Sequence, residues 1–147
     1  MQNRVFVTVL DAKFRKLEGE TRFVSLKVLE ILKRKKIFLE VYLVSEDSIR
    51  RLNRDYRGSD KPTNVLSFGE VSKSVFKEPE NDLGKGFRGI GEIYLCPSYI
   101  ARFKEDFRLM LTHGLLHLLG YDHERRSDRI RMQNLEKRIC RKILSLV

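Results

Sequence analysis

The chain has 147 residues, of which 30 are Lys or Arg and 20 are Asp or Glu, so its formal net charge is +10. This length suits one domain, residues 1–147, and a hydrophobic fraction of 41% excludes a wholly disordered chain. No apolar run approaches the roughly 18 residues that a membrane span needs, and the alternating start MQNRVFV lacks the apolar region of a signal peptide. We therefore expect a cytoplasmic protein that is not associated with a membrane.

The positive charge indicates a polyanionic partner such as nucleic acid. A surface rich in Lys, Arg and Glu, of the kind found in thermophiles, also explains part of that charge. The two cysteines, Cys96 and Cys140, have neither CxxC nor metal-ligand spacing. We expect both to be buried or half-buried thiols of a reduced protein.

The first half of the chain alternates strand and helix patterns. Thr21 is placed to cap a helix that reaches about residue 36, and the helix dipole favours the basic run Lys33–Lys36 in its last turn. Ser45 is placed to cap a short helix that ends near Asn53. The alternating or β-branched and aromatic patterns predict strands at residues 4–10 and 37–44.

The second half begins with a strand at residues 64–69 and continues, after a long loop or hairpin connection at 70–88, with a strand at 89–95. Pro97 is expected to start a helical region. A helix over about 103–119 would turn one face, from Phe103 to Leu118, toward the core, and Gly120 would end it. A last helix starts near Ser127. The pattern predicts an α+β domain in which helices cover a small mixed sheet of about four strands.

The three histidines of the chain, His113, His117 and His123, fall within eleven residues in the pattern HxxxHxxGxxH. The first two are four residues apart on the predicted helix, so both side chains emerge on one face and can reach one metal ion. Gly120 lets the chain turn sharply and bring His123 back toward that ion. Three imidazoles with an open fourth position are typical of a catalytic metal site, and they suit zinc as well as nickel, copper or iron.

Gly114 separates this pattern from that of the zinc proteases. The extended protease motif H-E-x-x-H-x-x-G-x-x-H has a glutamate general base at this position, and the rest of the motif agrees. Without that carboxylate a peptidase lacks the group that activates the metal-bound water. We therefore disfavour a peptidase and expect hydrolysis of an electrophile with an anionic transition state.

A polar segment at residues 52–68, LNRDYRGSDKPTNVLSF, supplies positive groups for such a reaction. Arg57 can donate two hydrogen bonds to a phosphate, Lys61 adds a point charge and Tyr56 offers a ring for stacking. On its own this is weak evidence, because an arginine in a polar loop is most often only solvated.

Taken together, LNRDYRGSDKPTNVLSF (52–68), GIGEIYL (89–95) and HGLLHLLGYDH (113–123) resemble the YbeY family of bacterial metal-dependent endoribonucleases, also called ribosomal RNA maturation factors. The resemblance implies that His113, His117 and His123 bind one Zn²⁺ and that Arg57 is a catalytic residue. It also implies single-stranded RNA as substrate, maturation of the 3′ end of small-subunit ribosomal RNA, and ribosome quality control with the ribosome or its proteins as partners.

Two positions depart from the family pattern. Asn64 and Glu92 stand where family members usually or often have Asp. We expect Asn64 to fix the loop geometry through local hydrogen bonds. Asp122 is a candidate to orient an imidazole, and a turn residue at a helix end explains it equally well. An RNA- or ribosome-binding module with a structural metal remains the main alternative function.

Overall fold

The computed structural model describes residues 3–69, 86–121 and 126–146, which form five α-helices, one 3-10 helix and a four-stranded sheet. The predicted α+β fold is confirmed. In chain order the elements are β1 (Arg4–Val9), η1 (Ala12–Leu17), α1 (Glu18–Ile31), β2 (Ile37–Leu43), α2 (Glu46–Arg57), β3 (Val65–Gly69), β4 (Arg88–Leu95), α3 (Pro97–Arg102), α4 (Phe107–Leu118) and α5 (Arg126–Leu144).

The sheet is mixed, with the strand order β1-β2-β4-β3. β1 pairs parallel with β2, β2 pairs parallel with β4, and β3 is antiparallel to β4 at the edge. The register between β2 and β4 shifts at Phe38 and Leu39, next to Gly91. Gly91 has φ +130°, and a Cβ there would lie 2.2 Å from the carbonyl oxygen of Phe68, so the close pairing of β3 and β4 requires glycine.

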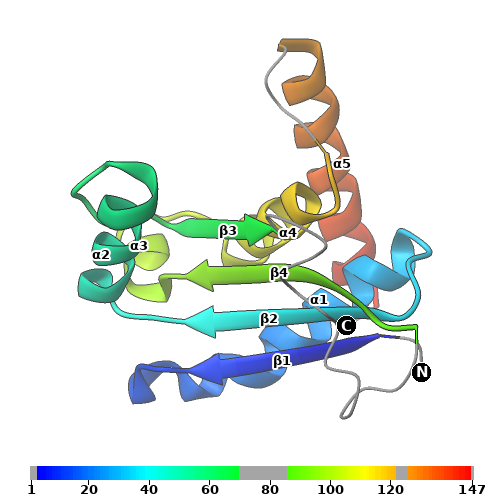
Figure 1. Cartoon of the computed structure of the whole chain (residues 1–147). Helices are drawn as coiled ribbons and strands as arrows, with labels where there is room; N and C mark the ends of the chain where they lie inside the picture. Colours follow the sequence, from blue (N-terminus) through cyan, green and yellow to red (C-terminus); the bar gives the residue numbers. More distant parts are fainter. Residues whose placement is uncertain (1–2, 70–85, 122–125, 147) are drawn as a thin grey trace.

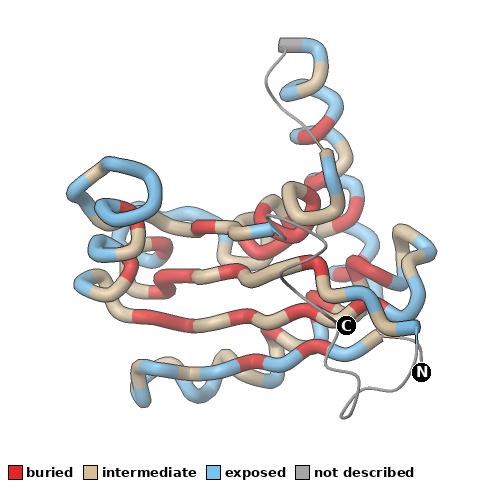
Figure 2. The backbone as a smooth tube through the Cα atoms, viewed as in Figure 1, coloured by how far each residue is buried: buried red, intermediate tan, exposed pale blue. Residues whose placement is uncertain are grey.

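One face of the sheet is covered by α1, α4 and α5, and α2 and α3 lie together at one end of it (Figure 1). Alternate residues of β2 are fully buried because each strand turns every second side chain toward these helices (Figure 2). The core is aliphatic, and its completely buried members include Leu29 of α1, Leu39 and Leu43 of β2, Ile93 and Leu95 of β4, Leu111, Leu115 and Leu116 of α4, and Ile139 and Ile143 of α5.

The opposite face of the sheet carries aromatic and acidic side chains. Tyr42 and Tyr94 stack with their ring centroids 4.8 Å apart, and Phe68 meets Tyr94 edge to face. The hydroxyls of the two tyrosines donate to the carboxylates of Glu40 and Glu92 on the same strands. A second small cluster, Val44, Ile49, Leu66 and Cys96, fixes α2 and α3 at the end of this face.

Helix α1 begins and ends earlier than the sequence predicted. Thr21 does not cap it: it is a buried residue inside the helix, and its hydroxyl donates to the carbonyl of Leu17 at 2.7 Å. Because the helix ends at Ile31, the basic run at 33–36 lies in the connection to β2, where Lys33 and Lys36 have positive φ. That connection must turn the chain sharply before β2 begins, which the local periodicity of the sequence does not reveal.

The helix predicted over 103–119 is α4, which begins only at Phe107. Pro97 begins a separate short helix, α3, as expected. α3 ends at Arg102, and Phe103 follows it with its side chain 54% exposed, so this residue does not belong to the core face. Asp106 then caps α4 by accepting from the backbone N–H of Arg108 and Leu109. The sequence predicted too early a start for α4 because apolar residues at helical spacing also precede Phe107.

Other local predictions are confirmed. Ser45 caps α2 by accepting from the backbone N–H of Ser48 at 3.2 Å, and Gly120, with φ +93°, follows the end of α4. Cys96 is a buried thiol and Cys140 a half-buried one, and burial raises the pKa of both. Most of the loop expected at 70–88 falls outside the described residues. No helix in the described ranges is long and apolar enough to cross a membrane.

Candidate active site

His113 and His117 lie on successive turns of α4 and face one pocket. Their ring centroids are 4.8 Å apart and their planes are inclined by 74°. Both line a pocket of about 880 Å³ between α4, α5, the end of α2 and the strands β3 and β4. The prediction that the two imidazoles share one face is confirmed, and their spacing suits two ligands of one metal ion.

His123 and the neighbouring Asp122 lie outside the described residues, so their roles stay predictions. In the part of the chain that is described, no three His, Cys, Asp or Glu side chains gather into a group that could hold a metal. The chain does turn directly after α4: the backbone N–H of Gly120 donates to the carbonyl of His117 at 3.0 Å. The sharp turn expected at Gly120 is therefore present.

Glu136 of α5 is a site residue that sequence reasoning missed. Its carboxylate is bonded to Nδ1 of His113, and the residue is only 5% exposed. A carboxylate on Nδ1 fixes the ring orientation of a metal-binding histidine and makes Nε2 the ligand atom. The sequence does hint at this role, because Glu136 is a charged residue within the apolar stripe that Met132, Ile139 and Ile143 form on α5.

Arg57 reaches the same pocket from the other side. It is the last residue of α2 and not part of a loop, since α2 extends beyond Asn53 and ends only at Gly58, which has φ +72°. Its Nη2 donates to the carbonyl of Ser67 at 2.8 Å, and its guanidinium carbon lies 5.0 Å from the ring centroid of Phe68. These two contacts hold Arg57 at the rim of the pocket that the histidines line.

The other candidates from the polar segment do not line the pocket. Tyr56 is 68% exposed and meets Phe68 edge to face on the outer side of the sheet. Lys61 is exposed, and its backbone carbonyl accepts from the side-chain amide of Asn53 at 2.8 Å. The cations that do line the pocket, among the described residues, are Arg57, Arg88 and Lys137.

Asn64 makes the local hydrogen bond that we predicted, because its Oδ1 accepts from the backbone N–H of Val65 at 2.7 Å. Its Nδ2 donates to the carboxylate of Glu105 at 3.1 Å, a bond that an aspartate could not make. Asn64 lines the pocket, whereas Glu92 bonds to Tyr94 on the outer face of the sheet. Only the first departure from the family pattern therefore lies at the site.

Gly114 faces the sheet and not the pocket. A Cβ at this position would lie 2.9 Å from Oγ of Ser67, 3.1 Å from Val65 and 3.3 Å from Ile93. The carbonyl of Gly114 also accepts from the Ser67 hydroxyl at 3.1 Å, which binds α4 closely to β3. The packing thus leaves no room for the glutamate that a zinc protease carries here.

Two imidazoles, a buried carboxylate bonded to one of them, and a guanidinium at the rim converge on one pocket. These are side-chain types that bind metal ions and anions. The donor set suits a divalent metal that prefers nitrogen ligands, and the arginine suits a phosphate. The side chains come from α2, α4 and α5, so the site depends on the packing of these elements around β3 and β4.

Comparisons with known proteins give relatives of the chain in sequence and in structure. The family model described as Endoribonuclease YbeY matches residues 8–144. Curated proteins with the same name are similar. The protein from Halorhodospira halophila is 41% identical, and the matched region covers 69% of this chain and 67% of that protein. The protein from Thermotoga maritima is 36% identical, and the matched region covers 67% of this chain and 63% of that protein. The chain thus spans about two thirds or less of these relatives. The solution structure of TM1509 from Thermotoga maritima matches with a TM-score of 0.55 and 28% identity, over 97% of this chain and 89% of that one.

Proposed function

Because the chain belongs to the YbeY endoribonuclease family, we propose that it is a metal-dependent endoribonuclease that cleaves single-stranded RNA. The observation that supports this most directly is the convergence of His113, His117 and Arg57 on one pocket. The net charge of +10 further supports a polyanionic substrate. We place its action in the cytoplasm, on the 3′ end of small-subunit ribosomal RNA, as a maturation and quality-control step with the ribosome or its proteins as partners.

In this proposal His113, His117 and His123 hold one Zn²⁺. The bound ion would supply a Lewis acid for a phosphoryl oxygen and would lower the pKa of a bound water to about 7. The residues present fit such an ion, because Glu136 holds His113 through Nδ1 in the way that carboxylates orient metal-binding imidazoles.

Arg57 is proposed to bind the phosphodiester. Its contacts with Ser67 and Phe68 fix the guanidinium before substrate arrives, and its remaining N–H groups can donate to phosphate oxygens. A guanidinium that is already in place stabilises the negative charge that develops in the transition state without having to reorganise.

The test is cleavage of single-stranded RNA by the purified protein, with His117→Ala and Arg57→Ala as controls and elemental analysis of the bound metal. We expect both variants to lose activity and the native protein to contain about one equivalent of zinc. Equal cleavage by all three proteins would reveal a contaminating nuclease and refute the mechanism.

A chelator separates catalysis from the alternative of a binding module with a structural metal. If the metal is catalytic, its removal abolishes cleavage and changes the melting temperature little. If the metal is structural, its removal unfolds the protein and RNA binds without being cut.

A further inference from the structure

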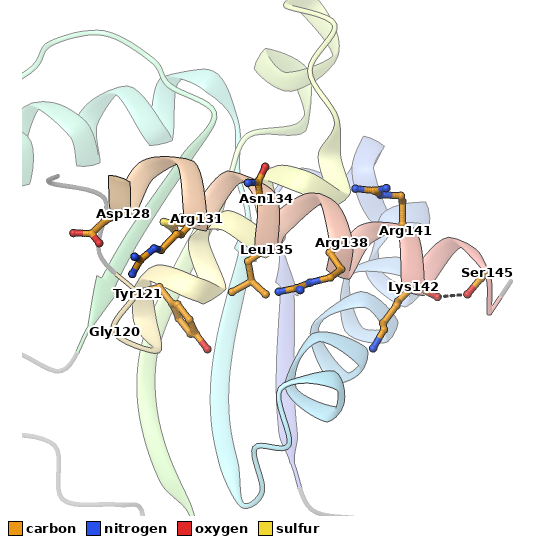
Figure 3. Close-up of a pocket in the computed structure, with 11 residues that line it drawn as sticks. Gly120, Tyr121, Asp128, Arg131, Asn134, Leu135, Arg138, Arg141, Lys142 and Ser145 are labelled. Atoms are coloured by element: carbon orange, nitrogen blue, oxygen red, sulfur yellow. Dashed lines mark hydrogen bonds between the residues drawn. The ribbon is translucent and has the colours of Figure 1, made fainter. Parts of the chain in front are cut away.

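A second hollow, separate from the candidate active site, lies along α5. It has a volume of about 1070 Å³ and runs from Gly120 and Tyr121, just after α4, to the last turn of α5. In Figure 3, Arg131, Arg138 and Lys142 extend from the side of α5 that also carries Leu135 and faces Tyr121. We call this surface the α5 groove.

The three cations form a row because of their spacing. Arg138 and Lys142 follow Arg131 by seven and eleven residues, which brings all three to nearly the same direction around a helix of 3.6 residues per turn. With a rise of 1.5 Å per residue, the row is about 16 Å long. An exposed row of this length matches a ligand with several negative charges in line better than a single small anion.

The row is not neutralised by the described part of the chain. Elsewhere Arg50, Arg54, Arg102 and Arg108 each form an ion pair with a carboxylate. Among the described residues no ion pair or hydrogen bond involves the charged groups of Arg131, Arg138 or Lys142, and Asp128 is the one acidic residue that lines the groove.

Helix stability accounts for only part of this pattern. The helix dipole favours cations in the last turn of α5, which explains Lys142 and the neighbouring Arg141. Arg131 and Arg138 lie in the interior of the helix, where the dipole gives cations no advantage. The dipole therefore does not account for these two arginines, whereas charge complementarity to a polyanion does.

The groove also lies close to the candidate active site. The backbone N–H of Tyr121 donates to Leu116 in the last turn of α4, one residue before His117. On α5, Glu136 and Lys137 line the active-site pocket, and Leu135 and Arg138 line the groove. A chain-like substrate that occupies the pocket can therefore continue around α5 into the groove.

We propose that the α5 groove binds the phosphodiester backbone of single-stranded RNA outside the cleavage site, with Arg131 and Arg138 as the main phosphate contacts. This inference rests on the proposed function, since it assumes an RNA substrate. Tyr121 and Asn134 line the same groove and add a ring and an amide with which bases can interact.

The test compares two double variants of the full chain that remove the same charge. Arg131→Gln/Arg138→Gln alters the groove, and Arg51→Gln/Arg129→Gln alters exposed arginines that line neither the groove nor the pocket. Binding of a short labelled single-stranded RNA is measured by filter retention at several salt concentrations, the RNA is checked on a gel, and melting temperatures are recorded.

We expect the groove variant to bind about 10- to 30-fold more weakly at 0.1 M salt. We also expect its slope of log affinity against log salt to be about 1.4 smaller, from two lost contacts at about 0.7 each. The control variant should stay within about twofold of the native protein, and all three should melt alike. Equal RNA affinity of the two double variants would refute RNA binding by the groove and leave the proposed function standing. A native protein that neither binds nor cleaves RNA would overturn both.

Discussion

The two faces of the sheet are built from different residues and position different parts of the candidate site. The inner face, under α1, α4 and α5, is mainly aliphatic, largely buried and packed so closely that α4 needs a glycine against β3. The outer face is aromatic and acidic, and its tyrosines and carboxylates are only half-buried. The active-site pocket lies at the β3 edge of the sheet, where Arg57 crosses the ring of Phe68 from the outer side.

This difference shows which contacts set the geometry of the site. The inner layer places His113, His117 and Glu136, so a change there should move the proposed metal ligands or unfold the protein. The outer face positions Arg57 through the ring of Phe68 and the carbonyl of Ser67. A change there should therefore alter catalysis and leave the fold intact. Four substitutions test this division.

Gly114→Glu should have the largest effect, because it puts a charged side chain into the contact between α4 and β3. Overpacking costs about 1–3 kcal/mol and an unpaired buried charge adds more, so we expect a loss of at least about 3 kcal/mol in the free energy of unfolding. Urea denaturation measures it. The control is Gly19→Glu in the first turn of α1, where a Cβ meets nothing within 4 Å. A Gly114→Glu protein that folds stably and hydrolyses casein would refute both the packing argument and the rejection of a peptidase.

Arg57→Ala should lower the rate of RNA cleavage by about 10²–10³-fold, as the loss of one preorganised donor to a transition state does. The free energy of unfolding should change by less than about 0.5 kcal/mol, because the side chain is exposed. Arg57→Lys keeps the charge but not the paired N–H groups, so it should recover little activity. Full recovery in the lysine variant would show that only the charge of Arg57 matters.

Glu136→Gln should weaken metal binding about 10- to 100-fold, the usual cost of losing a carboxylate behind a ligand histidine. The fold should survive, because the amide oxygen can still accept from Nδ1. Glu136→Ala removes that partner altogether and should cost about 1–3 kcal/mol of folding stability as well. Competition with a zinc chelator and urea denaturation measure the two quantities. Unchanged zinc affinity in both variants would mean that Glu136 does not position His113 for a metal.

The elements that the sequence could predict are those that depend on local spacing. The period of four places His113 and His117 on one face of α4, and the cap at Ser45 starts α2 where expected. The sequence did not reveal the role of Glu136, because its partner His113 is 23 residues away and only the packing of α5 on α4 brings the two together. The start of α4 was predicted four residues too early for a different, local reason, since apolar residues at helical spacing precede Phe107.

The smallest expected effect concerns the outer face. Burial, with the carboxylates of Glu40 and Glu92 nearby, raises the pKa of Tyr42 from 10.0 to about 12. In the unfolded chain the phenol ionises near its ordinary value, so between pH 10 and 12 the folded state binds more protons, and its stability falls as pH rises through that range. We expect Tyr42→Phe to flatten this fall modestly, because the ring is only half-buried. Urea denaturation at pH 9 and pH 11 compares the two proteins, and the lysines, which titrate in both, cancel in the difference. Parallel loss of stability in the native protein and in Tyr42→Phe would show that the outer face does not distinguish the two ionisation states of this side chain.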